Sequence, residues 1–246
     1  MKRFLSLLAA MACCHCTVLG QQNLFNIPSG DITPKGKVFY QHQLNLYSDK
    51  LESKAHFVVG LGKGWDAGVN LVGKTLGLRN NLVFLANDNP GRGALSPFLL
   101  PTLQKQFRVS PRLDVNMGTQ AGMNLTGKFE NKEFGWYNYA LGVYYLQQRK
   151  SRLVAGVYHT NPLLMGPGNR VGMLLGYEIK LTPRWYLMGD WMSGSNDAGV
   201  AVIGGMYNMS RRSQLCFGML VPNPGNPGPV GLVLELNLLG WDLDLK

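Results

Sequence analysis

The chain alternates between apolar and polar positions over most of its length. From Leu113 to Leu125, every second residue is apolar except Thr119, and the residues between them are polar or glycine. Side chains two residues apart lie on the same face of a β-strand. This period therefore predicts a strand with apolar surroundings on one face and polar surroundings on the other.

About twelve segments show the same period, and most are nine to twelve residues long. A tilted strand needs roughly 9–11 residues to cross a bilayer, and a sheet in lipid must close on itself to pair its backbone groups. We therefore predict an all-β fold, a single closed antiparallel transmembrane β-barrel of about twelve strands over residues 37–246. The segments begin near residues 37, 52, 64, 99, 112, 135, 152, 170, 184, 198, 214 and 230.

The links between these segments alternate in length from the second segment onward. Such alternation is typical of bacterial outer-membrane barrels, which have short periplasmic turns at one end and longer extracellular loops at the other. The connections of a soluble Greek-key sandwich are not expected to alternate in length in this way. The short turns are 62–64, 110–112, 149–152, 182–184 and 209–213, and the long links are 74–97, 125–133, 161–169, 194–197 and 222–229.

The composition favours a surface that is not mainly in water. Charged residues make up 15% of the chain, against roughly 25% in average soluble domains. The 31 glycines suit the crowded inner wall of a barrel, whose outer wall would carry the large apolar side chains. A secreted, soluble β-sandwich that binds a ligand remains the alternative. An aromatic girdle is expected from Trp65, Trp136, Tyr137, Trp185 and Trp191.

The N-terminal segment has the pattern of an export signal. Lys2 and Arg3 precede an apolar run that is too short to span a bilayer as a helix. Residues 1–20 are expected to be the signal peptide, and residues 21–36 an irregular periplasmic lead. Lipid attachment at Cys13 is an alternative to simple cleavage. Cys216 would then be alone in the mature chain, so we expect no disulfide framework and no cysteine metal site.

In period and link length the sequence resembles the single-chain outer-membrane β-barrels of Gram-negative bacteria, by pattern and not by a subfamily motif. The resemblance implies a location in the outer membrane, contact with its lipid, and recognition by the barrel-assembly machinery. The C-terminus departs from the family pattern, because Lys246 stands where a terminal aromatic residue is usual. The alternation also changes phase after Leu238, which predicts either a bulge there or a short tail.

The polar face of the strands would line the lumen. We predict a passive pore or transporter for small solutes, with anions as one candidate class and without catalytic residues. The same charges could instead satisfy one another and fill a narrow barrel. If the link 74–97 folds inward, Arg79, Asp88 and Arg92 would line a constriction. The predicted lumen residues are Lys54, Asp66, Arg108, Asp114, Asn116, Gln120, Arg170, Glu178, Lys180, Asp190 and Glu235.

Other kinds of chemistry are disfavoured by the sequence. The net charge of +10 is scattered, mostly at turn positions, so no nucleic-acid partner is expected. Residues 68–75 match a phosphate-loop pattern, but they lie in a strand and no helix follows. The histidines lack metal-ligand spacing, and we predict no metal and no cofactor. His159 beside Thr160 leaves open a lipid-modifying hydrolase, and His42 is unusual because it falls on an apolar face.

Overall fold

The computed structural model describes residues 22–79, 82–126 and 133–242. The expected signal segment, Cys13 and Lys246 lie outside these residues. Three short helical turns, η1 (Pro90–Arg92), η3 (Gln147–Arg149) and α2 (Pro162–Met165), lie between strands. The strands are β1 (Lys37–Leu46), β2 (Lys50–Gly62), β3 (Trp65–Gly77), β4 (Val83–Leu85), β5 (Phe98–Ser110), β6 (Leu113–Asn124), β7 (Phe134–Leu146), β8 (Ser151–Thr160), β9 (Val171–Lys180), β10 (Trp185–Met192), β11 (Val200–Asn208), β12 (Ser213–Pro222) and β13 (Gly231–Asp242).

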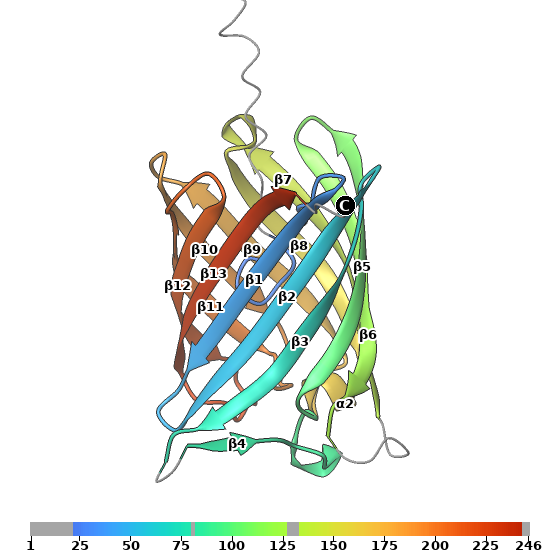
Figure 1. Cartoon of the computed structure of the whole chain (residues 1–246), viewed down its shortest axis with the longest axis vertical. Helices are drawn as coiled ribbons and strands as arrows, with labels where there is room; N and C mark the ends of the chain where they lie inside the picture. Colours follow the sequence, from blue (N-terminus) through green and yellow to red (C-terminus); the bar gives the residue numbers. More distant parts are fainter. Residues whose placement is uncertain (1–21, 80–81, 127–132, 243–246) are drawn as a thin grey trace, which may run out of the picture.

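Twelve of the strands in the described part of the chain form a closed barrel (Figure 1). Every pairing is antiparallel, and the ring is completed where β1 pairs with β13 and β2 pairs with β3. The short strand β4 pairs with the end of β3 and stays outside the ring. The prediction of a closed antiparallel barrel of about twelve strands is therefore confirmed.

The two ends of the barrel differ, as the link lengths predict. Tight turns follow β2, β5, β7, β9 and β11, whereas longer loops follow β3, β6, β8, β10 and β12. Figure 1 shows the tight turns at the top, together with the C-terminal end of β13. We call these the short-turn end and the long-loop end. Among the described residues, no helix is long and apolar enough to cross a membrane.

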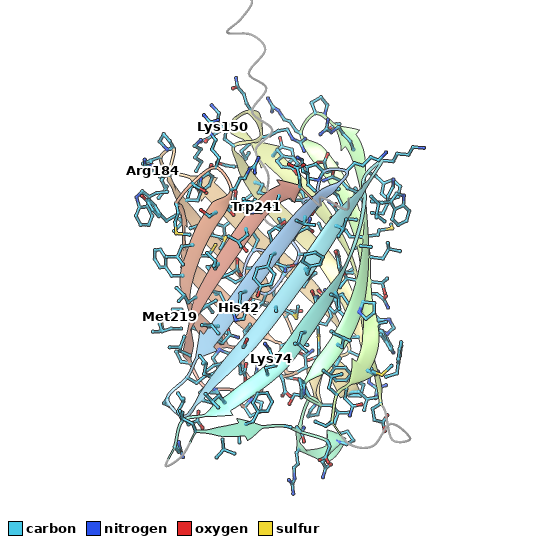
Figure 2. The ribbon with its side chains drawn as sticks, in the orientation of Figure 1. His42, Lys74, Lys150, Arg184, Met219 and Trp241 are labelled. Atoms are coloured by element: carbon cyan, nitrogen blue, oxygen red, sulfur yellow. The ribbon has the colours of Figure 1, made fainter. Side chains whose placement is uncertain are left out.

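The outer wall is apolar and the inner wall is largely polar. Met219 and Trp241 point away from the barrel in Figure 2, and each exposes about half of its surface (51% and 48%). An apolar surface of this extent suits contact with lipid rather than with water. Other exposed outer residues are Phe57, Leu61, Trp65, Leu99, Leu103, Phe107, Met117, Leu153, Val157, Met173, Leu187, Ile203, Phe217, Leu232 and Leu234.

Strand β7 reverses the expected orientation of its two faces. Tyr137, Tyr139, Leu141 and Val143 are buried inside the barrel with exposed fractions of 0–8%. Tyr137 therefore belongs to the interior and not to an aromatic girdle. These side chains join a buried apolar cluster with residues of the N-terminal segment, so one side of the lumen is a packed apolar core. The sequence pattern alone does not show whether the apolar face of a strand packs against such a core or against lipid.

The closing strand contains the bulge that the phase change predicts. Tyr40 pairs with Leu238 and Val38 pairs with Trp241, so β13 has one more residue than β1 between these pairs. Gly240 has a positive φ of 62° at this point. Leu239 keeps the inward parity of Glu235 and Asn237 and is buried, and the bulge turns Trp241 outward. The described end of the chain is thus part of the barrel wall up to Asp242.

Candidate functional site

The N-terminal segment runs inside the barrel. Residues 22–33, which we call the plug, contain no strand and fold into a tight loop in which Ser29 N–H donates to the carbonyl of Gln22 (2.9 Å). The sequence predicts an irregular periplasmic lead over residues 21–36. The segment is irregular, but it lies within the ring of strands, where the blue loop is visible in Figure 1.

Apolar side chains hold one side of the plug. The side chains of Leu24, Phe25 and Ile27 have exposed fractions of 2% or less. They belong to the same apolar cluster as the inward residues of β7–β12. Gly176 of β9 permits this close approach, because a Cβ there would lie 2.3 Å from Leu24 Cδ1. Burying each such side chain stabilises the packed state by about 1.5–3 kcal/mol. The plug is therefore packed like a protein core and is not a loose tail.

One carboxylate holds the tip of the plug. Asp190 Oδ2 accepts hydrogen bonds from the backbone N–H groups of Phe25 (2.8 Å), Asn26 (2.5 Å) and Ile27 (3.0 Å). Asp190 comes from β10, more than 160 positions away in the sequence. Hydrogen bonds to an ionised acceptor are stronger than those between neutral groups. This cradle fixes the backbone of the plug at its apolar tip.

A second carboxylate holds both ends of the plug. Asp66 Oδ2 accepts from Gln22 Nε2 (2.9 Å) and from Thr33 N–H (3.1 Å). Two glutamines of β5 then donate to plug carbonyls, Gln104 to Asp31 (2.8 Å) and Gln106 to Gly30 (2.8 Å). The polar inner wall of β3 and β5 thus binds the plug through its backbone.

Arg152 links the plug to the barrel, and sequence reasoning missed it. It lies on β8 with its side chain 5% exposed, between the carboxylates of Asp31 and Glu178. The Arg152 Nη2–Glu178 Oε2 distance is 2.6 Å. From the sequence Arg152 is expected to be a turn residue, because it is the last residue of the basic turn 149–152. Arg152 shares the parity of Val154, which is buried inside the barrel, and the sequence alone would assign that apolar face to lipid.

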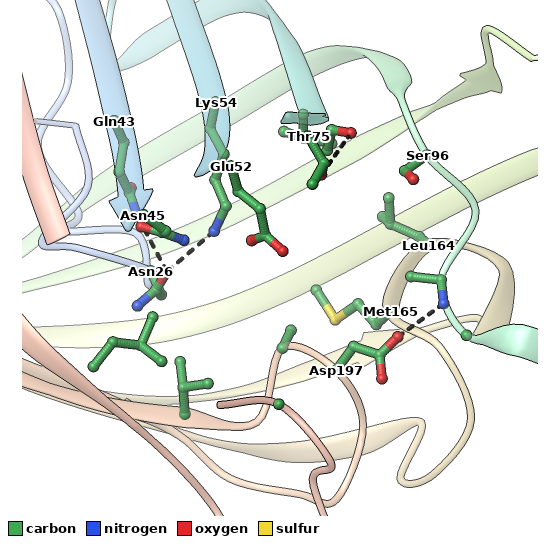
Figure 3. Close-up of a pocket in the computed structure, with 18 of the residues that line it drawn as sticks. Asn26, Gln43, Asn45, Glu52, Lys54, Thr75, Ser96, Leu164, Met165 and Asp197 are labelled. Atoms are coloured by element: carbon green, nitrogen blue, oxygen red, sulfur yellow. Dashed lines mark hydrogen bonds between the residues drawn. The ribbon is translucent and has the colours of Figure 1, made fainter. Parts of the chain in front are cut away.

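Beyond the plug, a cavity of about 690 Å³ opens toward the long-loop end. Asn23, Phe25, Asn26 and Pro28 of the plug line it, and loop residues such as Arg92 and Asn226 line its mouth. Lys54 Nζ donates to Asn26 Oδ1 (3.2 Å), as Figure 3 shows. The cavity thus lies against the plug. A second space along the plug measures only about 10 Å³.

The charges around the cavity are balanced. Three acidic and three basic side chains line it among the described residues, together with many amides. Burial and the neighbouring Glu52 raise the pKa of the Tyr47 phenol above its usual value, so Tyr47 stays neutral at the cavity wall. The charged lining residues are Asp49, Lys50, Glu52, Lys54, Arg92 and Asp197.

Most of the predicted lumen residues do lie inside the barrel. Asp114 and Asn116 are completely buried, as is Glu235. Gln120 Oε1 accepts from Asn70 Nδ2 (2.9 Å), and Lys180 Nζ lies 5.8 Å from the Tyr186 ring centroid. Lys54, Asp66, Glu178 and Asp190 make the contacts described above.

Two of the predicted lumen residues lie at the ends of the barrel. Arg108 is 70% exposed at the short-turn end, with Nε 3.9 Å from Asp114 Oδ1. Arg149, a turn residue, donates to the same carboxylate at 2.5 Å. Arg170 is exposed just before β9 and does not line the cavity. Arg108 is two residues from the end of β5 and Arg170 precedes β9, so both side chains lie at the rims of the barrel.

The expected constriction loop reaches the cavity at only one of its three predicted residues. Arg92 lines the cavity, next to Gly93 and Ala94. Arg79 instead lies 3.9 Å from Asp49 with 77% of its side chain exposed, and Asp88 is exposed. The loop is held over the mouth by Asp197 Oδ2, which accepts from Ala94 N–H (2.8 Å; Figure 3).

His159 is not arranged as the hydrolase alternative requires. Its ring packs against Trp136 on the outer wall, with ring centroids 4.5 Å apart. Thr160 points inward and donates to the Trp136 carbonyl (2.8 Å). Within the described ranges, no cluster of three or more His, Cys, Asp or Glu residues is placed to hold a metal ion.

The fold and the lumen together define a membrane-spanning β-barrel with a packed plug. No protein-family model matches the sequence, and no curated protein matches it. Solved structures similar to the chain include the Ralstonia pickettii toluene transporter TbuX (9% identity, 91% of this chain and 97% of that one, TM-score 0.43). An outer membrane channel from Pseudomonas putida F1 is also similar (10% identity, 85% and 97%, TM-score 0.47). These sequence identities and TM-scores do not identify a solute for this chain.

Proposed function

We propose that the protein is an outer-membrane pore or transporter through which small polar solutes pass passively. The observation that carries the proposal is the polar cavity at the long-loop end, which abuts a plug held by hydrogen bonds and not by covalent links. A solute would enter the cavity from outside the cell and would pass when the plug shifts.

The lining of the cavity favours uncharged or zwitterionic solutes. Its acidic and basic side chains are equal in number, so the net charge of +10 is not concentrated there. Side-chain amides such as Gln41, Gln43 and Asn45 offer both donors and acceptors to hydroxyl groups. The volume of about 690 Å³ lies within the range of small-molecule sites, roughly 300–1,000 Å³. We therefore propose solutes of the size of a small sugar or amino acid.

Swelling of proteoliposomes in neutral sugars of increasing size tests this function. We expect swelling above that of protein-free liposomes for monosaccharides, with a steep decline for larger sugars. Parallel runs with small organic anions and cations at equal osmolarity test charge preference, and we expect similar rates for the two signs. Absence of swelling with every solute, in liposomes shown to contain folded barrel, would contradict the proposal.

A further inference from the structure

Four polar side chains gather on the outer wall of β1–β3, where lipid-facing residues are otherwise mostly apolar. They are Tyr40 and His42 of β1, Ser53 of β2 and Lys74 of β3. Figure 2 shows His42 and Lys74 on the same front face, with Lys74 nearer the long-loop end. Polar groups in contact with lipid are costly, so such a cluster calls for an explanation.

The cluster has the connectivity of an activated serine. Ser53 Oγ lies 3.2 Å from His42 Nε2, and the Tyr40 hydroxyl lies 3.0 Å from His42 Nδ1. In the tautomer with a proton on Nδ1, that N–H donates to the Tyr40 oxygen and Nε2 accepts the proton of Ser53. A nucleophile, a base and a group that orients the base are the parts that covalent catalysis requires.

A bulge in β3 places the positively charged side chain of Lys74 on the outer face of the barrel. Before the bulge, Asp66 and Asn70 point inward, and residues of the same parity would continue to do so. The register between β2 and β3 shifts after Ser53, and Gly73 adopts a positive φ of 72°. Lys74 consequently pairs with Ser53 on the outer face, while Thr75 is buried. Side chains paired in this way have Cβ atoms about 4.5–5.5 Å apart.

The cluster lies near the long-loop end of the outer wall. Ser53 lies three residues from the start of β2, and Lys74 three residues from the end of β3. This corresponds to roughly 10 Å along each strand from the long-loop end. The acyl esters of a bilayer lie just below the headgroups, so a site near this end of the wall would be within reach of them. Lys74 would face the negative charge of the headgroup.

We propose that the outer wall of β1–β3 is an acyl-ester hydrolase site for phospholipids of the outer leaflet. Ser53 Oγ forms a bond to the ester carbonyl carbon, and its proton passes to His42 Nε2. The ester C–O bond breaks, and the leaving alcohol oxygen takes that proton. Water then attacks the acyl carbon while His42 Nε2 takes its proton, the Ser53 Oγ–acyl bond breaks, that proton passes to Ser53 Oγ, and the fatty acid leaves. Tyr40 acts as a positioning residue through His42.

Release of fatty acid from phosphatidylethanolamine in mixed detergent micelles tests the site. We expect release by the wild type and a loss of at least about 100-fold in Ser53→Ala and in His42→Ala. Tyr40→Phe keeps the ring and should lower kcat with KM unchanged. Thr119→Ala is the matched control, because Thr119 is an outward hydroxyl that bonds Asn138 (2.7 Å) and should leave release unchanged.

Labelling with a fluorophosphonate provides a second readout that does not depend on the choice of lipid. We expect mass spectrometry to place the adduct on Ser53, and Ser53→Ala to abolish it. No release and no adduct from folded wild-type barrel would overturn the proposal, as would lipid binding by Lys74 without hydrolysis. The site is separate from the lumen, so Ser53→Ala should leave sugar-driven swelling intact. Failure of one activity therefore does not affect the other.

Discussion

At the scale of single residues, a few buried charges decide how the plug is held. Asp190, Asp66 and Arg152 lie on barrel strands, and each binds the plug through its side chain. Charged groups inside a barrel are costly unless they are paired and hydrogen-bonded. In this protein the plug supplies the missing partners, so the wall and the plug depend on each other.

Replacing Arg152 by methionine should destabilise the barrel. The change leaves the carboxylates of Asp31 and Glu178 close together without a cation, and breaking a buried pair costs about 3–5 kcal/mol. We expect a lower urea midpoint for unfolding in detergent. Arg184→Met is the control, because Arg184 is an exposed turn residue whose side chain, among the described residues, bonds only the Tyr207 hydroxyl (3.2 Å). Equal midpoints for the two variants would show that Arg152 is not a structural link.

At the scale of elements, β7 shows where a period of two is insufficient. The sequence correctly predicts the strand and its alternation, but a packed apolar core and a lipid face require the same residue types. Which of them β7 faces is decided by Leu24, Phe25 and Ile27, which are more than 100 positions away in the sequence. Those three residues have no strand period of their own, and therefore the plug was not predicted.

The orientation of β7 can be measured with single cysteines on a background in which Cys216 is replaced by alanine. We expect a lipid-soluble maleimide to react with Ala140→Cys, which lies on the outer face, and to react poorly with Leu141→Cys, which lies in the core. Leu153→Cys on β8 is the positive control, since Leu153 is 45% exposed. Preferential labelling at position 141 would mean that the strand has the opposite phase.

At the scale of the whole molecule, strand number, closure and the alternation of turns and loops follow from the sequence. They are set by local period and by turn residues, which act over short distances. Most of the residues predicted to face the lumen lie inside the barrel for the same reason, since alternate positions of a strand share a face. The contacts of Asp190 with the plug, the exposure of Arg170 and the outward path of Arg79 depend on tertiary packing, and no local pattern reveals them.

The conductance of single barrels in planar bilayers, compared between the wild type and Asp190→Ala, tests the central claim most directly. The substitution removes the acceptor of three backbone N–H groups, and losing even one charge-assisted bond of about 1.5 kcal/mol favours plug release about tenfold. Asp242→Ala, at the rim, is the control. We predict rare openings in the wild type and in the control, and at least tenfold higher open occupancy in Asp190→Ala. Equal occupancy in all three, or no conductance in any, would contradict a solute path closed by the plug.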